Sequence, residues 1–323
     1  MRLGHKPSLW LAYALSLLIT ADSYAKDGPA AVDSSQLVAR AVQNEIAANA
    51  PGGMRFMFRN ERRTAHLNQT KLIVETREGT AGLMVEEDGH PLSPARRQAE
   101  ESRLQNYIHN PEELNKKRKQ EKEDADRTIR IMKALPSAFI YEQDGTQPGS
   151  PSVGLPQDEL VRLKFRPNPD YDPPSRVEQV LTGMAGHLLI DTKENRIAEI
   201  DGTLQKDVGF GWGILGHLDR GGHFLVQQAD VDNRQWEITR MELSFTGKIL
   251  LFKKLNIRST DLFSDFRPVA PDLTFAQGVA LLQKEATRIE DAMPKPDADH
   301  SQSKAVTWKS ETGNATTLCC DHK

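Results

Sequence analysis

Residues 160–275 constrain the fold most strongly, because they form a succession of short strand-like segments separated by brief polar breaks. In the first segment Val161, Leu163 and Phe165 alternate with basic residues, a period of two that is typical of a strand with one face in water. Further strands are expected at residues 186–191, 196–201, 204–208, 223–229, 236–245 and 248–259. The breaks are mostly 2–6 residues, which suits hairpins, whereas parallel strands need crossovers of about a dozen residues or more. This segment therefore predicts a curved antiparallel sheet, a half-barrel with a concave face.

The other predicted elements lie on either side of that segment. Asp33-Ser34-Ser35 can cap a helix that continues to Asn49, and a last helix is expected from Thr274 to Met293. Additional strands are expected at 54–58, 71–76, 82–87 and 136–143, with a flexible loop at 144–157. Together these elements predict the α+β class, with helices that cover the sheet.

A charged helical insertion is predicted at residues 93–135, where Glu, Lys, Arg, Gln and Ala dominate. Ser93-Pro94 provides an N-cap followed by proline at the first helical position, and Asn110-Pro111 divides the insertion into two helices. Residues 112–127 are nearly all charged, with mixed signs that pair three and four positions apart. We expect a solvated helix that projects from the domain; the alternative is a docking arm for a protein partner.

The N-terminus has the features of a signal peptide over residues 1–25. An apolar stretch of 12 residues, Leu9–Thr20, is shorter than the roughly 20 residues of a membrane-spanning helix. Ser23-Tyr24-Ala25 then places small residues where a signal peptidase cleaves. We therefore expect an exported chain, periplasmic or extracellular, that is not an integral membrane protein after cleavage. A retained membrane anchor is the alternative.

The mature chain is expected to form a single domain over residues 33–292, followed by a disordered tail over 293–323 that is polar and poor in apolar residues. The two cysteines, Cys319 and Cys320, are adjacent in that tail, so they cannot staple distant parts of a fold. The net charge of −3 lacks the basic excess of a nucleic-acid binder, and no nucleic-acid partner is expected. No histidine pair has zinc-site spacing, and we expect no metal site, no cofactor and no catalytic residue.

A G-x-G-x-x-G string, Gly211–Gly216, does not predict a dinucleotide site. Such a site needs the string between a parallel strand and the start of a helix, whereas Asp219-Arg220-Gly221-Gly222 would end any helix here. The glycines are better explained as a bend or bulge that lets the sheet curl. The aromatic residues Phe210, Trp212 and Trp236 are then candidates for lining an apolar ligand site, with the hydrophobic core as the alternative role.

Several motifs of this segment resemble those of a known group of proteins. The strings Phe165-Arg166-Pro167-Asn168-Pro169 and Gly221-Gly222-His223-Phe224, with the segments 173–176, 186–191 and 263–267, are similar to secreted, largely uncharacterised bacterial proteins of acidobacterial type. Those proteins resemble the outer-membrane lipoprotein-sorting fold of LolA-type carriers and RseB-type regulators. The resemblance implies an unclosed β-barrel whose concave side is covered by helices and accommodates acyl chains. The long charged insertion departs from the compact carriers, and no functional residue is transferred.

These observations predict an exported, non-enzymatic protein that binds a lipid acyl chain or a lipoprotein-like apolar ligand in the concave face. The alternative is an envelope regulatory or scaffold protein that binds a protein partner through its charged helices. An enzyme would require histidines or carboxylates that converge in the concavity, such as His187, Asp191 and Asp207.

Overall fold

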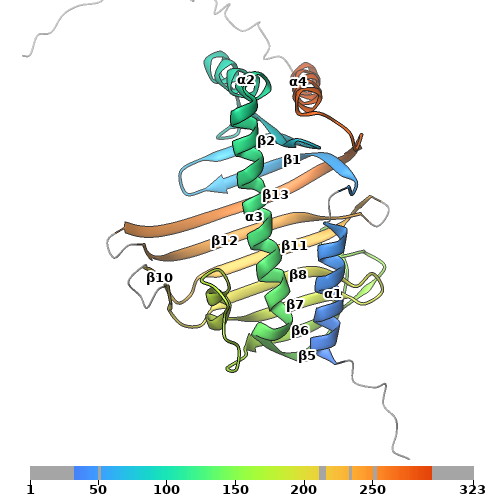
Figure 1. Cartoon of the computed structure of the whole chain (residues 1–323). Coiled ribbons are helices and arrows are strands. Elements are labelled where there is room, and N and C mark those ends of the chain that lie inside the picture. The colour runs from blue at the N-terminus through green and yellow to red at the C-terminus, as the bar shows by residue number, and fades with distance from the viewer. Residues whose placement is uncertain (1–32, 50–51, 211–215, 233–234, 250–252, 293–323) are drawn as a thin grey trace, which may run out of the picture.

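The computed structural model describes residues 33–49, 52–210, 216–232, 235–249 and 253–292. The predicted signal peptide, Trp212 and the predicted C-terminal tail lie outside these residues. The described part of the chain forms one large antiparallel sheet with helices packed on it (Figure 1). The prediction of an α+β protein built on an antiparallel sheet is confirmed.

The strand order in the sheet is β4-β3-β2-β1-β13-β12-β11-β8-β7-β6-β5, and β9 pairs with β10, which pairs with β12. Among the described residues the end strands β4 and β5 do not pair with each other, so the sheet is open. The strands are β1 Arg55–Thr64, β2 Asn68–Thr76, β3 Gly79–Glu87, β4 His90–Pro91, β5 Phe139–Pro148, β6 Glu159–Pro167, β7 Met184–Asp191, β8 Arg196–Leu204, β9 Val208–Phe210, β10 Gly216–Leu218, β11 His223–Asp232, β12 Gln235–Ile249 and β13 Lys253–Val269.

The helices are α1 Ser34–Ala48, α2 Pro94–His109, α3 Pro111–Ala138 and α4 Phe275–Ala292, with a short 3₁₀ helix, η1, at Glu178–Gly183. Their caps follow the sequence signals. The Asp33 carboxylate accepts a hydrogen bond from the Ser35 N–H at 3.0 Å, and the Ser93 hydroxyl accepts one from the Arg96 N–H at 3.4 Å. Asn110 ends α2 and caps α3 through its side chain, so the predicted division of the insertion at this residue is confirmed.

The predicted boundary between the last two long strands is wrong. A break was expected between 245 and 248, but β12 runs through Gly247 to Ile249. A Cβ at Gly247 would lie 2.1 Å from the carbonyl oxygen of His217 on β10. The glycine therefore permits close approach of a neighbouring strand, where the sequence pattern had indicated a turn.

The predicted strand at 136–143 and loop at 144–157 are also wrong in part. α3 continues through Pro136 to Ala138, and β5 extends from Phe139 to Pro148. Leu135 and Ala138 are buried against α1, and this packing outweighs the backbone hydrogen bond that Pro136 removes near the helix end. Gly145, with φ of +89°, lies in a register shift of the β5–β6 ladder, so the start of the expected loop is a bulge within a strand.

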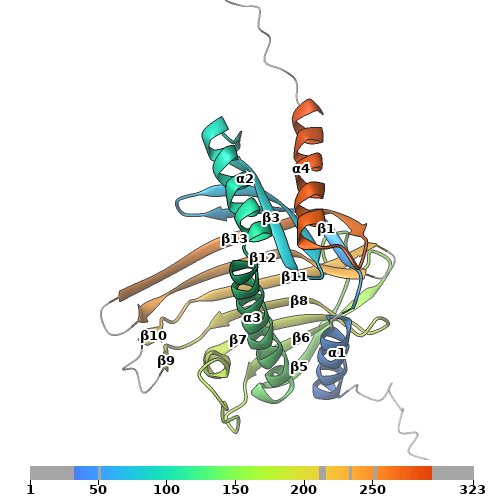
Figure 2. The ribbon, with the colours of Figure 1, turned by 45° about the horizontal axis from the view of Figure 1, so that its top comes forward.

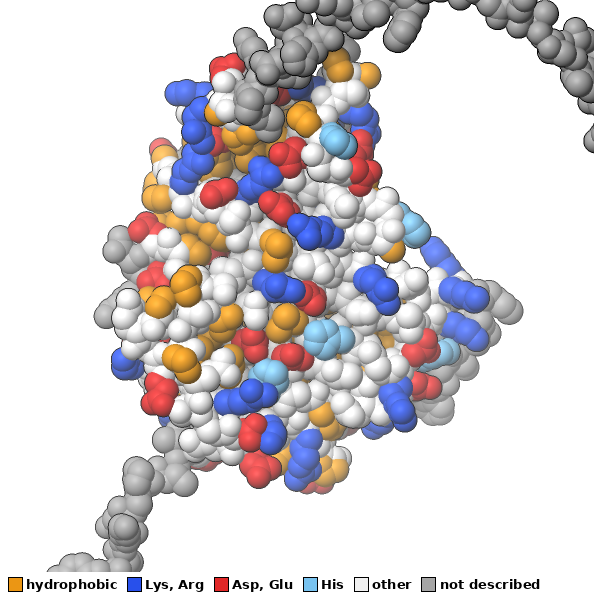
Figure 3. Space-filling view, turned by 180° about the vertical axis from the view of Figure 1, so that it is seen from behind, with side chains coloured by type: hydrophobic (Ala, Val, Ile, Leu, Met, Phe, Trp, Pro, Cys, Tyr) orange, Lys and Arg blue, Asp and Glu red, His pale blue; other side chains and the backbone are white. Residues whose placement is uncertain are grey.

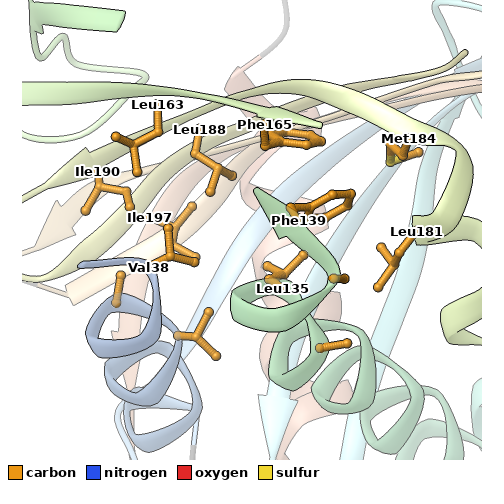
Figure 4. Close-up of a cluster of buried hydrophobic side chains, with 14 of the residues drawn as sticks. Val38, Leu135, Phe139, Leu163, Phe165, Leu181, Met184, Leu188, Ile190 and Ile197 are labelled. Carbon is orange, nitrogen blue, oxygen red and sulfur yellow. The ribbon is translucent and has the colours of Figure 1, made fainter. Parts of the chain in front are cut away.

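The first hydrophobic core lies between α1, the C-terminal end of α3 and strands β5–β8 (Figure 4). Leu163, Leu188 and Ile197 point from the sheet toward Val38 of α1 and Leu135 of α3, and all five are at most 4% exposed. Full burial of such a side chain contributes about 1.5–3 kcal/mol. We call the side of the sheet that carries this core the α1 face.

The second core lies at the other end of the sheet, where α4 and α2 pack on β1–β3. Phe275 and Leu282 of α4 and Leu104 of α2 are buried against Leu72 and Val74 of β2. We call this side of the sheet the α4 face.

The strand pairings show that the two cores occupy opposite faces. Directly paired residues point to the same side of a sheet, so the α1 face continues from Phe224 through Leu243 and Ser259 to Thr64 of β1. Met57 belongs to the second core and lies an odd number of positions from Thr64 on the same strand. Its side chain therefore points to the face opposite that of Thr64. The middle strands β11, β12 and β13 therefore lie between two cores that sit on different sides.

α3 crosses the α1 face from one end of the sheet to the other (Figure 2). Its N-terminal part packs against α2 and β3, and its C-terminal part packs against α1, β5 and η1. Between these anchors residues 122–128 are all exposed. Seven residues make nearly two helical turns, so every side of the helix faces solvent there. The prediction that this charged helix projects from the domain is wrong, while its predicted solvation is confirmed.

Most of the outer edge of β3 has no neighbouring strand, because β4 is only two residues long. The insertion covers this edge. Charged side chains of α2 and α3 take the hydrogen-bonding places that a neighbouring strand would fill. The three bonds join the Thr80 N–H to Glu121 at 3.3 Å, the Gly82 carbonyl to Arg103 at 2.7 Å and the Met84 N–H to Glu100 at 3.3 Å.

A buried ion pair joins α1 to β8. The Arg196 guanidinium donates to both carboxylate oxygens of Glu45, at 2.7 and 2.9 Å, and the Ile197 N–H donates to the same carboxylate at 2.9 Å. Glu45 is 1% exposed, so its charge depends on these donors.

We predict that Glu45→Ala lowers the free energy of unfolding by about 3–5 kcal/mol, because it leaves the Arg196 charge buried without a partner. The double change E45L/R196M should cost less, since it removes both charges. Urea unfolding measures these values, with Asp126→Ala as the control because Asp126 pairs with exposed Lys122 at the surface. A loss below 1 kcal/mol for Glu45→Ala would contradict the prediction.

Candidate functional site

The candidate site is an apolar part of the α1 face on the middle strands, which we call the open face. Its side chains are half-buried or exposed, and Ile257 is 39% exposed. Cross-strand pairs hold them in register, because β11 pairs with β12 and β12 with β13. The members of the open face are Phe224, Val226, Met241, Leu243, Phe245 and Ile257.

Phe224 and Phe245 lie at the edge of the first core, and the rest of the open face has no helix packed on it because of where the helices are anchored. The principal packing partners of α3 are α1, α2, β3, β5 and η1, at the two ends of the sheet. Where α3 passes the middle strands, its residues 122–128 are exposed on every side, so this stretch makes no close packing with the described strands below it. A contiguous apolar surface that stays partly exposed on a folded protein can mark a binding site, and here five members are half-buried and Ile257 is exposed.

Polar groups border the open face where β13 meets β1. The Asn60 amide donates to the Asp261 carboxylate at 3.2 Å in a buried pair, and the Arg62 Nε lies 3.9 Å from the same carboxylate. The hydroxyl of Ser259 is buried without a hydrogen-bond partner in the described part of the chain. Burial, followed by the charge of Arg103, lowers the pKa of the nearby Lys71. The α1 face thus changes from apolar to polar across adjacent strands.

The structure does not bring the predicted aromatic site residues together. Phe210, at the end of β9, is half-buried against the first core on the α1 face. Trp236 is 5% exposed and packs with Leu160, Leu189 and Ala198. Leu189 and Ala198 alternate with residues of the first core, so this cluster lies on the other face of the sheet. Trp212 lies outside the described residues.

The sequence did contain a signal for the open face. On β11, Phe224 and Val226 alternate with His223, Leu225 and Gln227. On β12, Met241, Leu243 and Phe245 are separated by the polar residues Glu242 and Ser244. That alternation predicts a shared face, but it does not tell whether a helix covers the face. The structure shows that Phe224 and Phe245 are half-buried and pack against the edge of the first core.

The opposite side of the middle strands carries charged and histidine side chains among hydrophobic ones (Figure 3). His187 lies 2.9 Å from Glu199, which also accepts a hydrogen bond from Gln227 at 2.7 Å, and His223 lies 3.0 Å from Asp201. Burial raises the pKa of the Glu199 carboxylate, but the hydrogen bonds from His187 and Gln227 outweigh it and hold that pKa below its usual value.

The residues that would have indicated an enzyme are engaged separately. His187 contacts Glu199, as described above. The Asp191 carboxylate accepts hydrogen bonds from the backbone N–H groups of Lys193 and Glu194, at 2.9 and 3.0 Å, within a turn. The Asp207 carboxylate accepts one from the Arg220 N–H at 2.7 Å. These bonds explain the two aspartates by turn chemistry.

A separate hollow of about 190 Å³ lies between α2, α4 and strand β3. Val85, Leu92 and Ile289 are among its lining residues, and Arg97 and Glu290 form an ion pair beside it. Ligand pockets usually measure about 300–1,000 Å³, so this hollow is small for a ligand of ordinary size. The open face is the better candidate.

Within the described residues, no group of three or more histidine, cysteine or acidic side chains is arranged to hold a metal ion. None of the helices in this part of the chain combines the length and apolarity needed to cross a bilayer.

Comparison with known proteins gives little further guidance. No family model matches the chain, and no curated protein matches it. Among solved structures, the chain is similar to a domain from Vibrio parahaemolyticus assigned as an outer membrane lipoprotein-sorting protein, with 9% identity and a TM-score of 0.30. The match covers 76% of this chain and 97% of that domain. At this level the similarity supports no argument about the ligand.

Glu237 on β12 makes the region next to the open face sensitive to pH. Burial, together with the nearby negative charges of Glu75 and Glu45, raises its pKa from 4.5 to about 7, although Arg196 opposes the shift. The folded state therefore binds a proton at pH values where the unfolded state has lost it. Stability should fall as pH rises from 4.5 to 7 and stay lower above that range.

We predict that Glu237→Gln removes this dependence. The melting temperature of the variant minus that of the wild type should increase between pH 4.5 and pH 7 and then level off. Thermal unfolding in a pH series measures the difference. A difference that stays constant over this range would contradict the prediction.

Proposed function

We propose that this chain is an exported, non-enzymatic protein that binds an acyl chain or a lipoprotein-like apolar ligand on the open face. One observation carries the proposal: three adjacent middle strands present apolar side chains on a side of the sheet where the packed helices cover only the two ends. In this proposal the open sheet acts as a half-barrel, and α3 passes over the bound ligand.

Hydrophobic burial alone supports useful affinity at such a surface. Burying one methylene group contributes about 0.8 kcal/mol, so a chain of a dozen carbons could contribute about 9 kcal/mol before the costs of association. The polar border at Asn60, Ser259 and Asp261 offers hydrogen-bonding groups for a polar end of the same ligand. An amphiphile therefore fits this face better than a fully apolar or fully polar ligand.

Two parts of the proposal rest on the sequence. Export rests on the predicted signal peptide at residues 1–25. The likeness to secreted proteins of acidobacterial type, and through them to lipoprotein carriers, rests on the motifs between residues 165 and 267. Native mass spectrometry of protein purified from an envelope fraction tests for a bound ligand directly.

A matched pair of variants tests the location of the site. Leu243 lies on the open face, while Leu225, on the neighbouring strand, is equally half-buried and lies on the opposite side of the sheet. We predict that Leu243→Asn weakens binding of a solvatochromic dye or a fatty acid roughly tenfold, because a polar side chain replaces apolar contact area. Leu225→Asn should leave this affinity within about twofold of the wild type.

Fluorescence titration measures both affinities, and circular dichroism confirms that both variants fold. The proposal fails if the wild-type protein takes up no dye and is recovered with only the mass of the bare chain. It also fails if the two leucine variants lose affinity equally.

A second candidate function is protein binding through the exposed middle of α3. Residues 122–128 are accessible on every side, which suits a docking helix. Their charges are paired within the helix, Lys122 with Asp126 at 2.6 Å and Arg127 with Asp124 at 2.7 Å. Such exposed pairs contribute little to stability, so they can be exchanged for contacts with a partner.

We predict for this second function that the charge reversal D124K/D126K abolishes co-purification of an envelope protein while dye binding is unchanged. Affinity purification from a cross-linked envelope fraction measures the first quantity, and fluorescence titration measures the second. Retention of the same partner by this variant would contradict the docking role.

A further inference from the structure

The far end of the β12–β13 hairpin carries a row of basic side chains that nothing in the proposed function uses. His217, Lys248 and Lys254 are direct cross-strand neighbours on β10, β12 and β13. Arg258 follows on the same side of β13, four positions from Lys254. Lys and Arg side chains gather at this projecting end of the molecule (Figure 3). We call these four residues the basic tip.

The basic tip has almost no compensating negative charge. Residues 246–258 contain four lysine or arginine residues and no acidic residue. His217 lies 3.1 Å from Asp219, whereas Lys248, Lys254 and Arg258 are exposed and make no ion pair within the described residues. Like charges directly opposite each other, as Lys248 and Lys254 are, destabilise a strand pair. The row is therefore poorly explained by folding stability and well explained by an anionic partner.

The other side of the same hairpin carries apolar side chains next to exposed Lys253. Leu255 is half-buried and Ile257 is 39% exposed, on the side opposite Lys254 and Arg258. Basic groups next to exposed apolar groups suit the boundary of a lipid bilayer, where cations meet headgroup phosphates and apolar side chains meet the acyl region. A nucleic acid would pair with the basic side chains, but it would leave Leu255 and Ile257 without apolar contacts.

We propose that the basic tip docks this protein onto the surface of an anionic lipid bilayer. The attraction is local, because the whole chain has a net charge of −3 and surface charge is screened within about 10 Å. It therefore orients the molecule with the hairpin toward the membrane. The inference does not depend on the proposed ligand, but Phe245 and Ile257 extend the open face toward this tip, which would bring a bound acyl chain close to the bilayer.

Vesicle co-sedimentation of the mature chain tests the inference, with phosphatidylcholine vesicles with and without phosphatidylglycerol. We expect binding only to the anionic vesicles, and weaker binding as salt is added. The charge reversal K248E/K254E should weaken binding roughly tenfold or more, since each basic residue near such a surface is worth about fivefold. The control K116E/K119E makes the same change in net charge on exposed residues of α3 and should change binding less than threefold.

The inference is overturned by equal binding to both kinds of vesicle, by unchanged binding of K248E/K254E, or by an equal loss in both double variants. It is also overturned if the chain binds a short DNA duplex but neither kind of vesicle. Dye uptake by each variant in the absence of vesicles keeps this result separate from that of the ligand proposal, because a folded K248E/K254E protein should still take up dye.

Discussion

The continuous antiparallel hydrogen-bond ladder is the constraint on which the rest of this structure depends. The middle strands β11, β12 and β13 have few fully buried side chains, yet they are held in place because β8 pairs on one side and β1 on the other. Each flanking region is fixed by its own hydrophobic core, one on the α1 face and one on the α4 face. A sheet supported in this way can leave apolar side chains uncovered at its centre without losing the fold.

The charged insertion makes physical sense within that arrangement. Its acidic and basic side chains replace the missing neighbour of β3, which protects an edge that would otherwise present unpaired backbone groups. Its far end supplies Leu135 and Ala138 to the first core. The stretch between these anchors has little apolar surface to bury, and its mostly charged side chains suit a helix that is exposed on every side.

The β12–β13 hairpin combines two surfaces through the period of two of its strands. One side carries part of the open face, and the other side carries Lys248, Lys254 and Arg258. A register slip of one residue would exchange the two sets, so the pairing with β10 and β11 decides which side is apolar. Binding of an amphiphile and docking on a lipid surface are compatible because they would use opposite sides of the same hairpin.

The amino-acid pattern alone determined the class of fold. Alternation in segments such as 160–165 and short polar breaks lead to antiparallel strands, while Asp33, Ser93 and Asn110 mark helix starts through bonds that each makes within a few residues. These features depend on local geometry, so they can be predicted from neighbouring residues. The open face was only half predictable, because alternation shows that Leu243 and Phe245 share a side but not whether a helix lies over it.

Tertiary structure decided the rest. It placed Trp236 in a buried cluster away from Phe210, kept Gly247 within a strand because a carbonyl of β10 lies beside it, and carried α3 through Pro136 because the first core holds Leu135 and Ala138. It also turned α3 across the sheet instead of away from it. Each of these outcomes depends on contacts between residues far apart in the chain, and the free energy of such contacts is invisible to a local pattern.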